Sequence, residues 1–554
     1  MSKDRKRLDA VRRDVGVLEN DLFDELLSGC IGRRDFMRHG SVLGLSLPLL
    51  GGIAGAVFGP TLSPRRAMAA GTPGATIRIG IGQPAGAIDP VTIADNGGLV
   101  LLEPTGEFLC RTGPDLVLQP QLAESWRPNT DGSVWTFKLR QDVTFQNGRK
   151  MTADDVIASI DRMADPKNSA NALSAFKGIL QKGNSRKIDD HTVEFHLDAP
   201  NGNFPYVLST DNYNLVILPA DYAGDYEKTF IGTGPFKLEK FTPKVGASFV
   251  RNPNYWGKPA LPERLEYSFF GDQQSQVLAL QGGDVDVLQQ VAFKGAQALF
   301  NDPNIDVMSI KSVSHQQVHM RTDMAPFQDK RVRRALALTL DRKKLVAGLF
   351  NGRASIGNDT PFAALFPSSD PTVPQREQNL AEAKQLLEAA GVGKGFDVKL
   401  TTERYMEIPD YAVLLQNFAK AVGINIALDV EDQNAYYGKA VFGQSDWLDS
   451  VLGITDYGHR GVPNVFLSAP LTSDGTWNSA HFKNPTYDKL VAQYIASPDL
   501  GGQRAIAGQI QRLLLDETPL IVGYFFDELV PMRKGLAGIP PIANRLFMEG
   551  AHFT

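Results

Sequence analysis

The stretch that decides the fold is Gly232-Thr233-Gly234-Pro235-Phe236-Lys237-Leu238, which continues to Arg251-Asn252-Pro253-Asn254-Tyr255-Trp256-Gly257. Its two glycines permit backbone geometries that a Cβ atom would forbid, and Pro235 stiffens the chain as it leaves them. The residues from 234 onward predict a strand that continues through 247–251. Asn252-Pro253-Asn254 predicts a turn, with two aromatic side chains behind it as apolar anchors. Such residues are typical of a scaffold, so the stretch identifies a fold rather than a ligand site.

On the N-terminal side of this stretch, apolar and polar residues alternate in several short segments. This pattern predicts strands over 76–81, 134–140 and 192–197. Thr152 and Asp155 have the spacing of a capping box, which predicts a helix over 153–164. Strands therefore outnumber helices in this half of the chain.

The C-terminal half is richer in helices. Apolar residues at helical spacing predict one long helix over 331–350, and a strand is expected at 424–430. Further helices are expected at 380–390, 411–422, 487–495 and 503–515. Helices that alternate with short apolar strands indicate mixed α/β lobes.

Composition limits the function classes. The chain has 554 residues, which exceeds the size of a single hydrophobic core and predicts two or three lobes. Its 57 Lys and Arg stand against 62 Asp and Glu, a net charge of −5 with no basic excess for nucleic acid. Two cysteines cannot build a disulfide framework.

Residues 1–69 read as an export signal. A charged segment ends in Arg33-Arg34-Asp35-Phe36-Met37-Arg38, and residues 39–64 contain no Asp, Glu, Lys or Arg. Ala67-Met68-Ala69-Ala70 then provides a small-residue cleavage site, expected near Ala69. The arginine pair resembles a twin-arginine (Tat) signal, although Gly32 replaces the usual Ser or Thr before it.

Two other interpretations of this segment are weaker. An uncleaved membrane anchor would be long enough, but glycines and Pro48 interrupt the apolar run. The lipobox-like sequence that ends at Cys30 is preceded by charged residues rather than by an apolar stretch. Cleavage would leave Cys110 as the one cysteine of the mature chain, which we expect to be soluble.

Four stretches together resemble family 5 of the extracellular solute-binding proteins of ABC importers, the group that binds dipeptides, oligopeptides or nickel. They follow the family's order over roughly 76–525. Besides the opening stretch, the matching segments are Leu122-Ala123-Glu124-Ser125-Trp126 with Met151-Thr152-Ala153-Asp154-Asp155-Val156, Gly283-Asp284-Val285-Asp286-Val287, and Pro326-Phe327-Gln328-Asp329-Lys330-Arg331-Val332-Arg333-Arg334-Ala335-Leu336.

This resemblance implies an α/β fold of the periplasmic binding protein-like type II. Two lobes are joined by a hinge and enclose the ligand, and an extra α/β domain is inserted in the first lobe. By analogy, lobe I comprises 71–102, 219–313 and 516–554, the insert 103–218, and lobe II 314–515. The hinge is expected near 313–324 and after Leu515. Hinge closure around a ligand is known for periplasmic binding proteins.

The resemblance also implies site residues. In peptide-binding members an Asp after a strand of the second lobe takes the ligand's ammonium group, and Asp456 stands at the matching place. A turn or helix-cap role for Asp456 is the alternative. Arg404 matches the arginine that takes the carboxylate, for which a planar guanidinium is suited. The aromatic candidates for stacking on the ligand are Tyr405, Trp447 and Tyr457.

The chain departs from the family pattern after Asp456. His459-Arg460-Gly461 stands where Asp-Pro-Asp would be usual. This places the cation of Arg460 near the predicted pocket and argues against a plain dipeptide. An anionic group such as a phosphate or a second carboxylate would suit Arg460.

Two other function classes are alternatives to a solute-binding protein. A Tat-exported enzyme lacks support, because the chain has no P-loop, no Cys-x-x-Cys and no G-x-S-x-G elbow, and Pro84 interrupts the only glycine-rich fingerprint. A nickel-chelate or metal-binding member of the same fold is the other alternative. His315 and His319 share a face if that stretch is a strand, but two histidines make a poor zinc site.

The sequence therefore predicts a periplasmic binding protein rather than an enzyme, with no catalytic residue, cofactor or metal. It would capture a peptide or peptide-like solute and deliver it to a membrane permease driven by an ATPase on other chains. The expected partners are that permease and the Tat machinery, with no nucleic acid, and the protein is expected to be a monomer.

Overall fold

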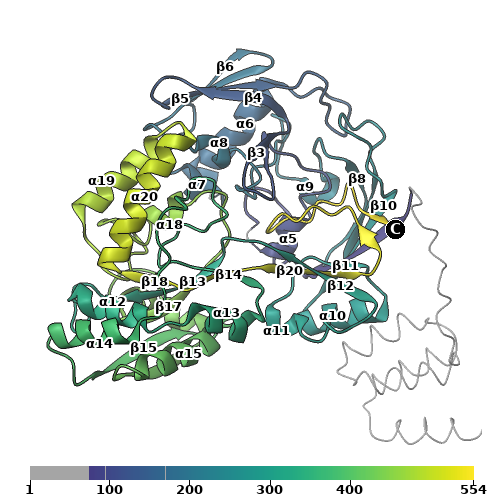
Figure 1. Ribbon diagram of the computed structural model, residues 1–554. Helices are drawn as coiled ribbons and strands as arrows, with labels where there is room; N and C mark the ends of the chain where they lie inside the picture. Colours follow the sequence, from purple (N-terminus) through teal and green to yellow (C-terminus); the bar gives the residue numbers. More distant parts are fainter. Residues whose placement is uncertain (1–73, 94, 169) are drawn as a thin grey trace, which may run out of the picture. The chain divides into compact units, whose positions relative to one another are not determined.

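The computed structural model describes residues 74–93, 95–168 and 170–554 (Figure 1). The predicted export signal, including Arg33, Arg34, Cys30 and the cleavage site near Ala69, lies outside the described residues. Within them, no helix combines the length and the apolar character that crossing a bilayer requires.

The first lobe is built on a seven-stranded mixed sheet. Its order is β12-β20-β11-β1-β10-β9-β8, in which β1 runs parallel to both β10 and β11. The bounds are β1 Thr76–Gly82, β8 Phe236–Thr242, β9 Gly246–Arg251, β10 Arg264–Phe270, β11 Val287–Leu288, β12 Ile305–Ile310 and β20 Glu528–Arg533. Helices α5 (Asn96–Val100), α9 (Tyr226–Thr229), α10 (Gln273–Gly282) and α11 (Phe293–Ala296) accompany this sheet.

The strand predicted to run from 234 through 251 is instead a hairpin. β8 and β9 pair antiparallel, with Phe236 opposite Arg251. Pro243 removes a backbone donor at the bend, and Lys244 adopts a positive φ of 63°. Gly232 was read correctly, since a Cβ atom there would overlap the carbonyl of Thr105.

A four-stranded antiparallel sheet forms a separate layer between residues 123 and 196. Its order is β4-β5-β7-β6, and the predicted capping box of Thr152 and Asp155 begins the helix beside it. The bounds are β4 Ala123–Pro128, β5 Val134–Leu139, β6 Ser185–Asp189, β7 Thr192–His196, α6 Ala153–Ala164, η1 Pro166–Asn168, α7 Leu173–Phe176 and α8 Phe204–Val207. The small pair β2 (Cys110–Thr112) and β3 (Leu118–Pro120) precedes it.

The second lobe is built on a five-stranded sheet with the order β16-β15-β17-β13-β18. Its strands are β13 His315–Met320, β15 Phe396–Glu403, β16 Ile424–Glu431, β17 Leu452–Tyr457 and β18 Leu520–Val522. β15 is parallel to β16 and β17, whereas β13 is antiparallel to β17 and β18.

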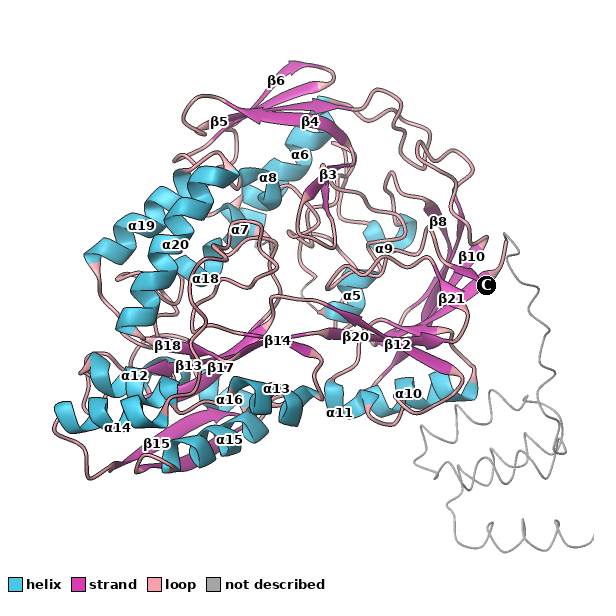
Figure 2. Cartoon of the chain, viewed as in Figure 1, coloured by secondary structure: helices cyan, strands magenta, loops and turns pink. Residues whose placement is uncertain are grey.

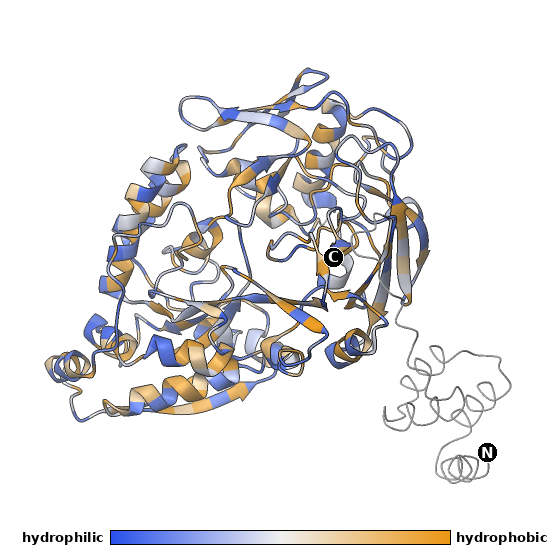
Figure 3. Cartoon of the chain, turned by 45° about the vertical axis from the view of Figure 1, so that its right-hand side comes forward, coloured by the Kyte–Doolittle hydropathy of each residue, from blue (hydrophilic) through white to orange (hydrophobic). Residues whose placement is uncertain are grey.

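Helices cover both faces of this sheet (Figures 1 and 2). Ile521 points into one apolar cluster, while its neighbours Leu520 and Val522 point into the other. The first cluster includes α12 (Lys330–Leu338), α13 (Arg342–Phe350), α14 (Leu380–Ala389) and α15 (Ile408–Lys420), and the second includes α18 (Asn464–Ser468), α19 (Pro485–Ala496) and α20 (Leu500–Glu517). Figure 3 shows apolar residues along the strands and both kinds of residue on the helices, as expected for helices with one buried face.

The single helix predicted over 331–350 is two helices. α12 ends at Leu338, and Asp341 then begins α13 by accepting a hydrogen bond from the Lys344 backbone N–H. A side chain that satisfies a free backbone donor in this way favours a new helix start over continuation. The apolar spacing alone did not reveal the break, because both helices face the same core.

Two segments connect the sheets of the lobes. Residues 311–314 lead from β12 to β13, and β19 (Tyr524–Phe526) leads from β18 to β20 and pairs with β14 (Ala354–Ile356). The two connections lie side by side, since Ser312 Oγ donates to the Phe526 carbonyl at 2.7 Å and the Phe526 N–H donates to the Ser314 carbonyl. The stretch 313–324, where a hinge was expected, consists mainly of β13.

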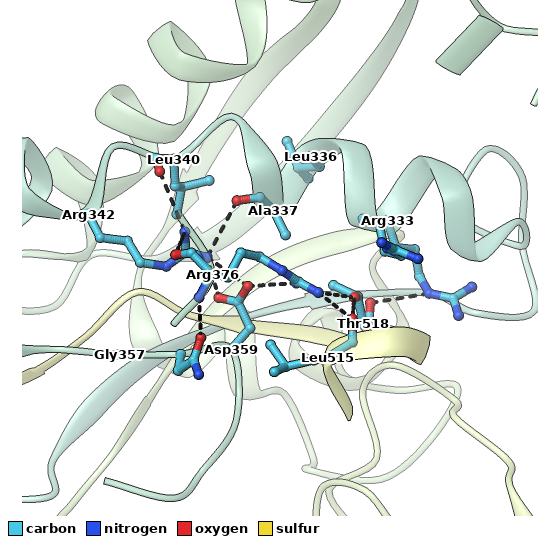
Figure 4. Close-up of polar contacts among 12 residues, drawn as sticks. Arg333, Leu336, Ala337, Leu340, Arg342, Gly357, Asp359, Arg376, Leu515 and Thr518 are labelled. Carbon is cyan, nitrogen blue, oxygen red and sulfur yellow. Dashed lines mark hydrogen bonds and ion pairs between the residues drawn. The ribbon is translucent and has the colours of Figure 1, made fainter. Parts of the chain in front are cut away.

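A buried ionic cluster holds the end of α20 just before the second connection (Figure 4). Asp359 is fully buried and accepts from Arg342 at 2.6 Å and from Arg376 at 2.7 Å. Arg376 also donates to the Leu515 carbonyl, and Arg333 donates to the Glu517 carbonyl at 2.9 Å. Cationic groups at the carbonyl end of a helix are favourable.

Candidate binding site

The candidate site lies where two parallel strands of the second lobe end together. β15 and β17 are neighbours with Thr402 opposite Ile454, so their carboxyl ends meet at one edge of the sheet. β15 ends at Glu403, and β17 ends one residue after Asp456. In open α/β sheets, ligands bind beyond the carboxyl ends of strands.

Asp456 is a partly exposed residue whose carboxyl is poorly satisfied. It lies within β17 opposite Gln316, rather than in a turn after the strand as in the family pattern. Burial, together with the neighbouring carboxyls of Glu403 and Glu407, raises its pKa to about 7 against the lowering effect of a hydrogen bond with Gln316. Among the described residues, nothing donates to the buried Asp456 Oδ1. A positively charged ligand group would satisfy this carboxyl.

Glu407 and Tyr405 follow β15 and complete the acidic surroundings. Glu407 precedes α15, is 4% exposed, and has an Oε1 that accepts no hydrogen bond within the described part of the chain. Burial raises its pKa. Tyr405 is 36% exposed, and burial raises its pKa to about 12, with contributions from Asp456, Glu403 and Glu407. All three carboxyl groups therefore act electrostatically on Tyr405.

Glu403 is held in place by two donors. Gln433 Nε2 donates to it at 2.6 Å and the Tyr437 hydroxyl at 2.7 Å, both from α16 (Gln433–Tyr437). Glu403 is completely buried. Its position is thereby fixed beside Asp456.

Aromatic rings line the region next to these carboxyls. Trp447, on α17 (Asp446–Asp449), lies 5.2 Å from Tyr437 and 6.3 Å from Trp477 between ring centroids. Tyr457 lies 6.4 Å from Trp477 and is stacked on His315 at 5.4 Å. Trp447 is 7% exposed, and its Nε1 has no acceptor among the described residues. The predicted residues Trp447 and Tyr457 thus belong to one aromatic group.

The site adjoins the connection between the lobes. Gln316, on β13, accepts a hydrogen bond from the hydroxyl of Tyr524, which lies on the connecting strand β19. Asp456 and Glu407 both act on the pKa of Tyr524, which burial raises. A ligand on Asp456 would therefore lie close to the segment that connects the two sheets.

Arg404 and Arg460 do not contact Asp456. Arg404 directly follows β15, as the resemblance implied, but its side chain is 66% exposed and lies 4.0 Å from Asp432. Arg460 donates to the carbonyl of His459 at 2.7 Å, and its charge acts on Asp211 in the first half of the chain. Neither arginine forms a hydrogen bond or ion pair with Asp456 in the described residues.

The described residues contain no group of three or more His, Cys, Asp or Glu side chains arranged to hold a metal ion. His315 and His319 do lie on one strand, β13. Burial lowers the pKa of each to about 4, so both are neutral at pH 7. Their ring nitrogens bond to backbone carbonyls of Val313 and Ser450.

The sequence reasoning missed several residues of this site. Glu403 and Glu407 flank the predicted residues Arg404 and Tyr405, and Gln316 is far away in the sequence. A strand prediction over 396–403 would have indicated Glu403, because a charged residue that ends a buried strand lies at the edge where ligands bind. Trp477 and Tyr437 carried no sequence signal, because only the fold brings their loop and short helix to β17.

Known proteins resemble the chain over most of its length. Residues 117–458 match the bacterial extracellular solute-binding proteins, family 5. The dipeptide-binding protein DppE of Bacillus subtilis is 26% identical over 78% of this chain and 83% of its own.

Solved structures agree on the fold. HbpA2 from Haemophilus parasuis superimposes with a TM-score of 0.76 at 23% identity, over 86% of this chain and all of that one. The periplasmic binding protein DppA from Helicobacter pylori, in complex with the peptide STSA, gives 0.67 at 21% identity over 87% and 98%. The architecture is therefore the two-lobed type II fold that the sequence predicted, and the chain belongs to family 5 of the bacterial extracellular solute-binding proteins.

Proposed function

We propose that this protein is the exported solute-binding component of an ABC import system for peptides or peptide-like solutes. The observation that carries the proposal is the unsatisfied carboxyl of Asp456, which directly precedes Tyr457 of the aromatic group and lies next to the connection between the lobes. Support comes from the family and from the peptide-binding names of its relatives. Export by the Tat route is part of the proposal and rests on the sequence alone.

The Asp456 carboxylate binds the ammonium group of the solute. Trp447, Tyr457 and Tyr405 pack against its apolar parts. Arg404 and Arg460 are the two candidates for its carboxylate. Arg404 belongs to the same lobe as Asp456, and its exposed side chain would reach the ligand by rotating. Arg460, whose charge acts on Asp211, would reach it when the lobes rearrange.

The protein binds its solute reversibly and catalyses no reaction on it. The segments 311–314 and 523–527 act as the hinge, with 103–218 as an insert of the first lobe. A ligand favours the closed form when it binds both lobes better in that form than in the open one. The closed form then docks on the permease.

Calorimetric titration of the mature protein with Ala-Ala, N-acetyl-Ala-Ala and Ala-Ala-amide tests the proposal. We expect saturable binding of Ala-Ala and a loss of at least tenfold on acetylation, which removes the ammonium group. Asp456→Asn should weaken Ala-Ala binding at least tenfold, or about 1.4 kcal/mol.

Arg404→Ala and Arg460→Ala identify the carboxylate partner, because the partner's variant no longer discriminates Ala-Ala from its amide. Glu388→Gln, an exposed change on α14, is the matched control and should bind as the wild type does. No saturable binding of any peptide would refute the proposed function.

A further inference from the structure

The surroundings of Asp456 hold more negative charge than one ammonium group neutralises. The carboxyl groups of Glu403, Glu407 and Asp456 all raise the pKa of Tyr405, and Glu403 and Asp456 lie at the adjacent ends of β15 and β17. The charge of Lys294 acts on Glu407, but Lys294 also bonds to Asp410 at 2.6 Å. Burying several carboxyls with so little positive charge is unfavourable, so these groups are only partly compensated in the free protein.

Unpartnered polar atoms point to a ligand at this place. Glu407 is 4% exposed, yet its Oε1 accepts no hydrogen bond from the described residues. Asp456 Oδ1 likewise has no hydrogen-bond donor among them. The Trp447 Nε1 donor is also free of an acceptor there. Buried polar groups of folded proteins nearly always have partners, so these atoms require one from outside the chain.

The two free carboxyl oxygens belong to different groups. Asp456 lies on β17, and Glu407 lies at the start of α15, beyond Tyr405. The described residues do not arrange three acidic or histidine side chains for a metal ion, so separate organic cations fit better than one bound ion. Trp447 and Tyr437, whose ring centroids lie 5.2 Å apart, and the partly exposed Tyr405 would offer apolar and π surface to the stem of such a ligand.

Building on the proposed function, we propose that the preferred solute carries a second positive charge, a lysine-like or arginine-like side chain, which Glu407 and Glu403 bind while Asp456 binds the ammonium group. Glu407 is the main partner, because Glu403 already accepts from Gln433 and Tyr437. This makes the protein selective for basic peptides or for peptide-like solutes with two cationic groups.

Matched dipeptides separate this inference from the proposed function. Lys-Ala and Ala-Lys are compared by calorimetry with norleucine-Ala and Ala-norleucine, which keep the aliphatic stem and lack the side-chain ammonium. We expect the lysine peptide to bind at least tenfold more tightly than its norleucine partner in at least one order. Glu407→Gln should reduce that ratio to threefold or less while the norleucine peptide binds as before.

The control variants keep the test decisive. Asp456→Asn should weaken lysine and norleucine peptides alike, whereas Glu388→Gln should change neither. Melting curves of each variant confirm that it is folded. Equal binding of lysine and norleucine peptides in both orders, or a lysine preference that survives Glu407→Gln and Glu403→Gln, would overturn the inference and leave the proposed function intact. Failure of all four dipeptides to bind would refute both.

Discussion

The buried carboxyl of Asp456 lowers the stability of the free protein, although we propose that it binds the ligand. Asp456 was identified from the sequence because it stands in a family pattern. Glu403, Glu407 and Gln316 were not, because their role depends on strand register and on a helix start. Register places Gln316 opposite Asp456, and no local sequence pattern reveals that pairing.

At the residue scale, we predict that Asp456→Asn stabilises the ligand-free protein at pH 8. Burial raises the folded-state pKa of Asp456 to about 7 from an ordinary value of 3.8. The folded state therefore binds the proton more tightly, and stability falls as the pH rises from about 4 to about 7. The variant lacks this loss, so it should exceed the wild type by about 1–3 kcal/mol above pH 7.

Urea unfolding of both proteins at pH 4.5 and pH 8 measures this difference. The advantage of Asp456→Asn should be small at pH 4.5 and largest at pH 8. A difference that does not change with pH would contradict the raised pKa.

The ends of helices and strands were predictable where neighbouring residues determine them. They were less predictable where a local break opposes the apolar pattern of the surrounding sequence. The capping box of Thr152 and Asp155 gave the start of α6 correctly, because both partners are close in the sequence. The break between α12 and α13 was missed because the apolar spacing continues across it, and the break between β8 and β9 was missed although Pro243 and Gly246 are typical turn residues. In both cases one polar or constrained residue, Asp341 or Pro243, outweighs the periodic pattern.

At the element scale, we predict that Asp359→Asn destabilises the second lobe strongly. The change leaves Arg342 and Arg376 buried without their carboxylate, and α20 loses part of the support of its last turn. Breaking a buried ion pair in this way costs about 3–5 kcal/mol. Asn is otherwise a close match, since it tolerates the positive φ of 49° at this position.

The matched control is Asp429→Asn, which removes the exposed pair of Asp429 with Lys399 in the same lobe. Such a pair contributes about 0–1 kcal/mol. Denaturant unfolding followed by tryptophan fluorescence compares the two variants. Similar small losses for both would show that the cluster in Figure 4 contributes little to stability.

Side-chain contacts, in addition to the two connecting segments, hold the two lobes together. Lys294, on α11 of the first lobe, bonds to Asp410 on α15 of the second at 2.6 Å. Beside this pair, the rings of Phe293 and Phe350 lie 6.0 Å apart between centroids. Asp410 lies near Glu407, and the Lys294 charge acts on Glu407. This contact between the lobes therefore adjoins the candidate site.

At the scale of the whole molecule, we predict that Lys294→Ala speeds ligand release twofold to fivefold with little effect on stability. The pair is solvent-exposed and contributes at most about 1 kcal/mol. That contribution exists only while α11 and α15 are in contact, and the prediction assigns this contact to the ligand-bound form, so its loss speeds release. Stopped-flow measurement of peptide dissociation tests this, with Lys399→Ala as the control within one lobe. Equal release rates for the two variants would contradict the prediction.

The place of β20 in the first sheet has a consequence for biosynthesis. Residues 528–533 lie between β12 and β11, so a strand from late in the chain fills an interior position of the sheet that residues 76–82 begin. When only the first half of the protein has been synthesised, the position between β12 and β11 has no strand. The sheet therefore stays incomplete until β20 has been synthesised. Folding of the first lobe must wait until translation has passed residue 533, and chaperones have that interval in which to hold the nascent chain.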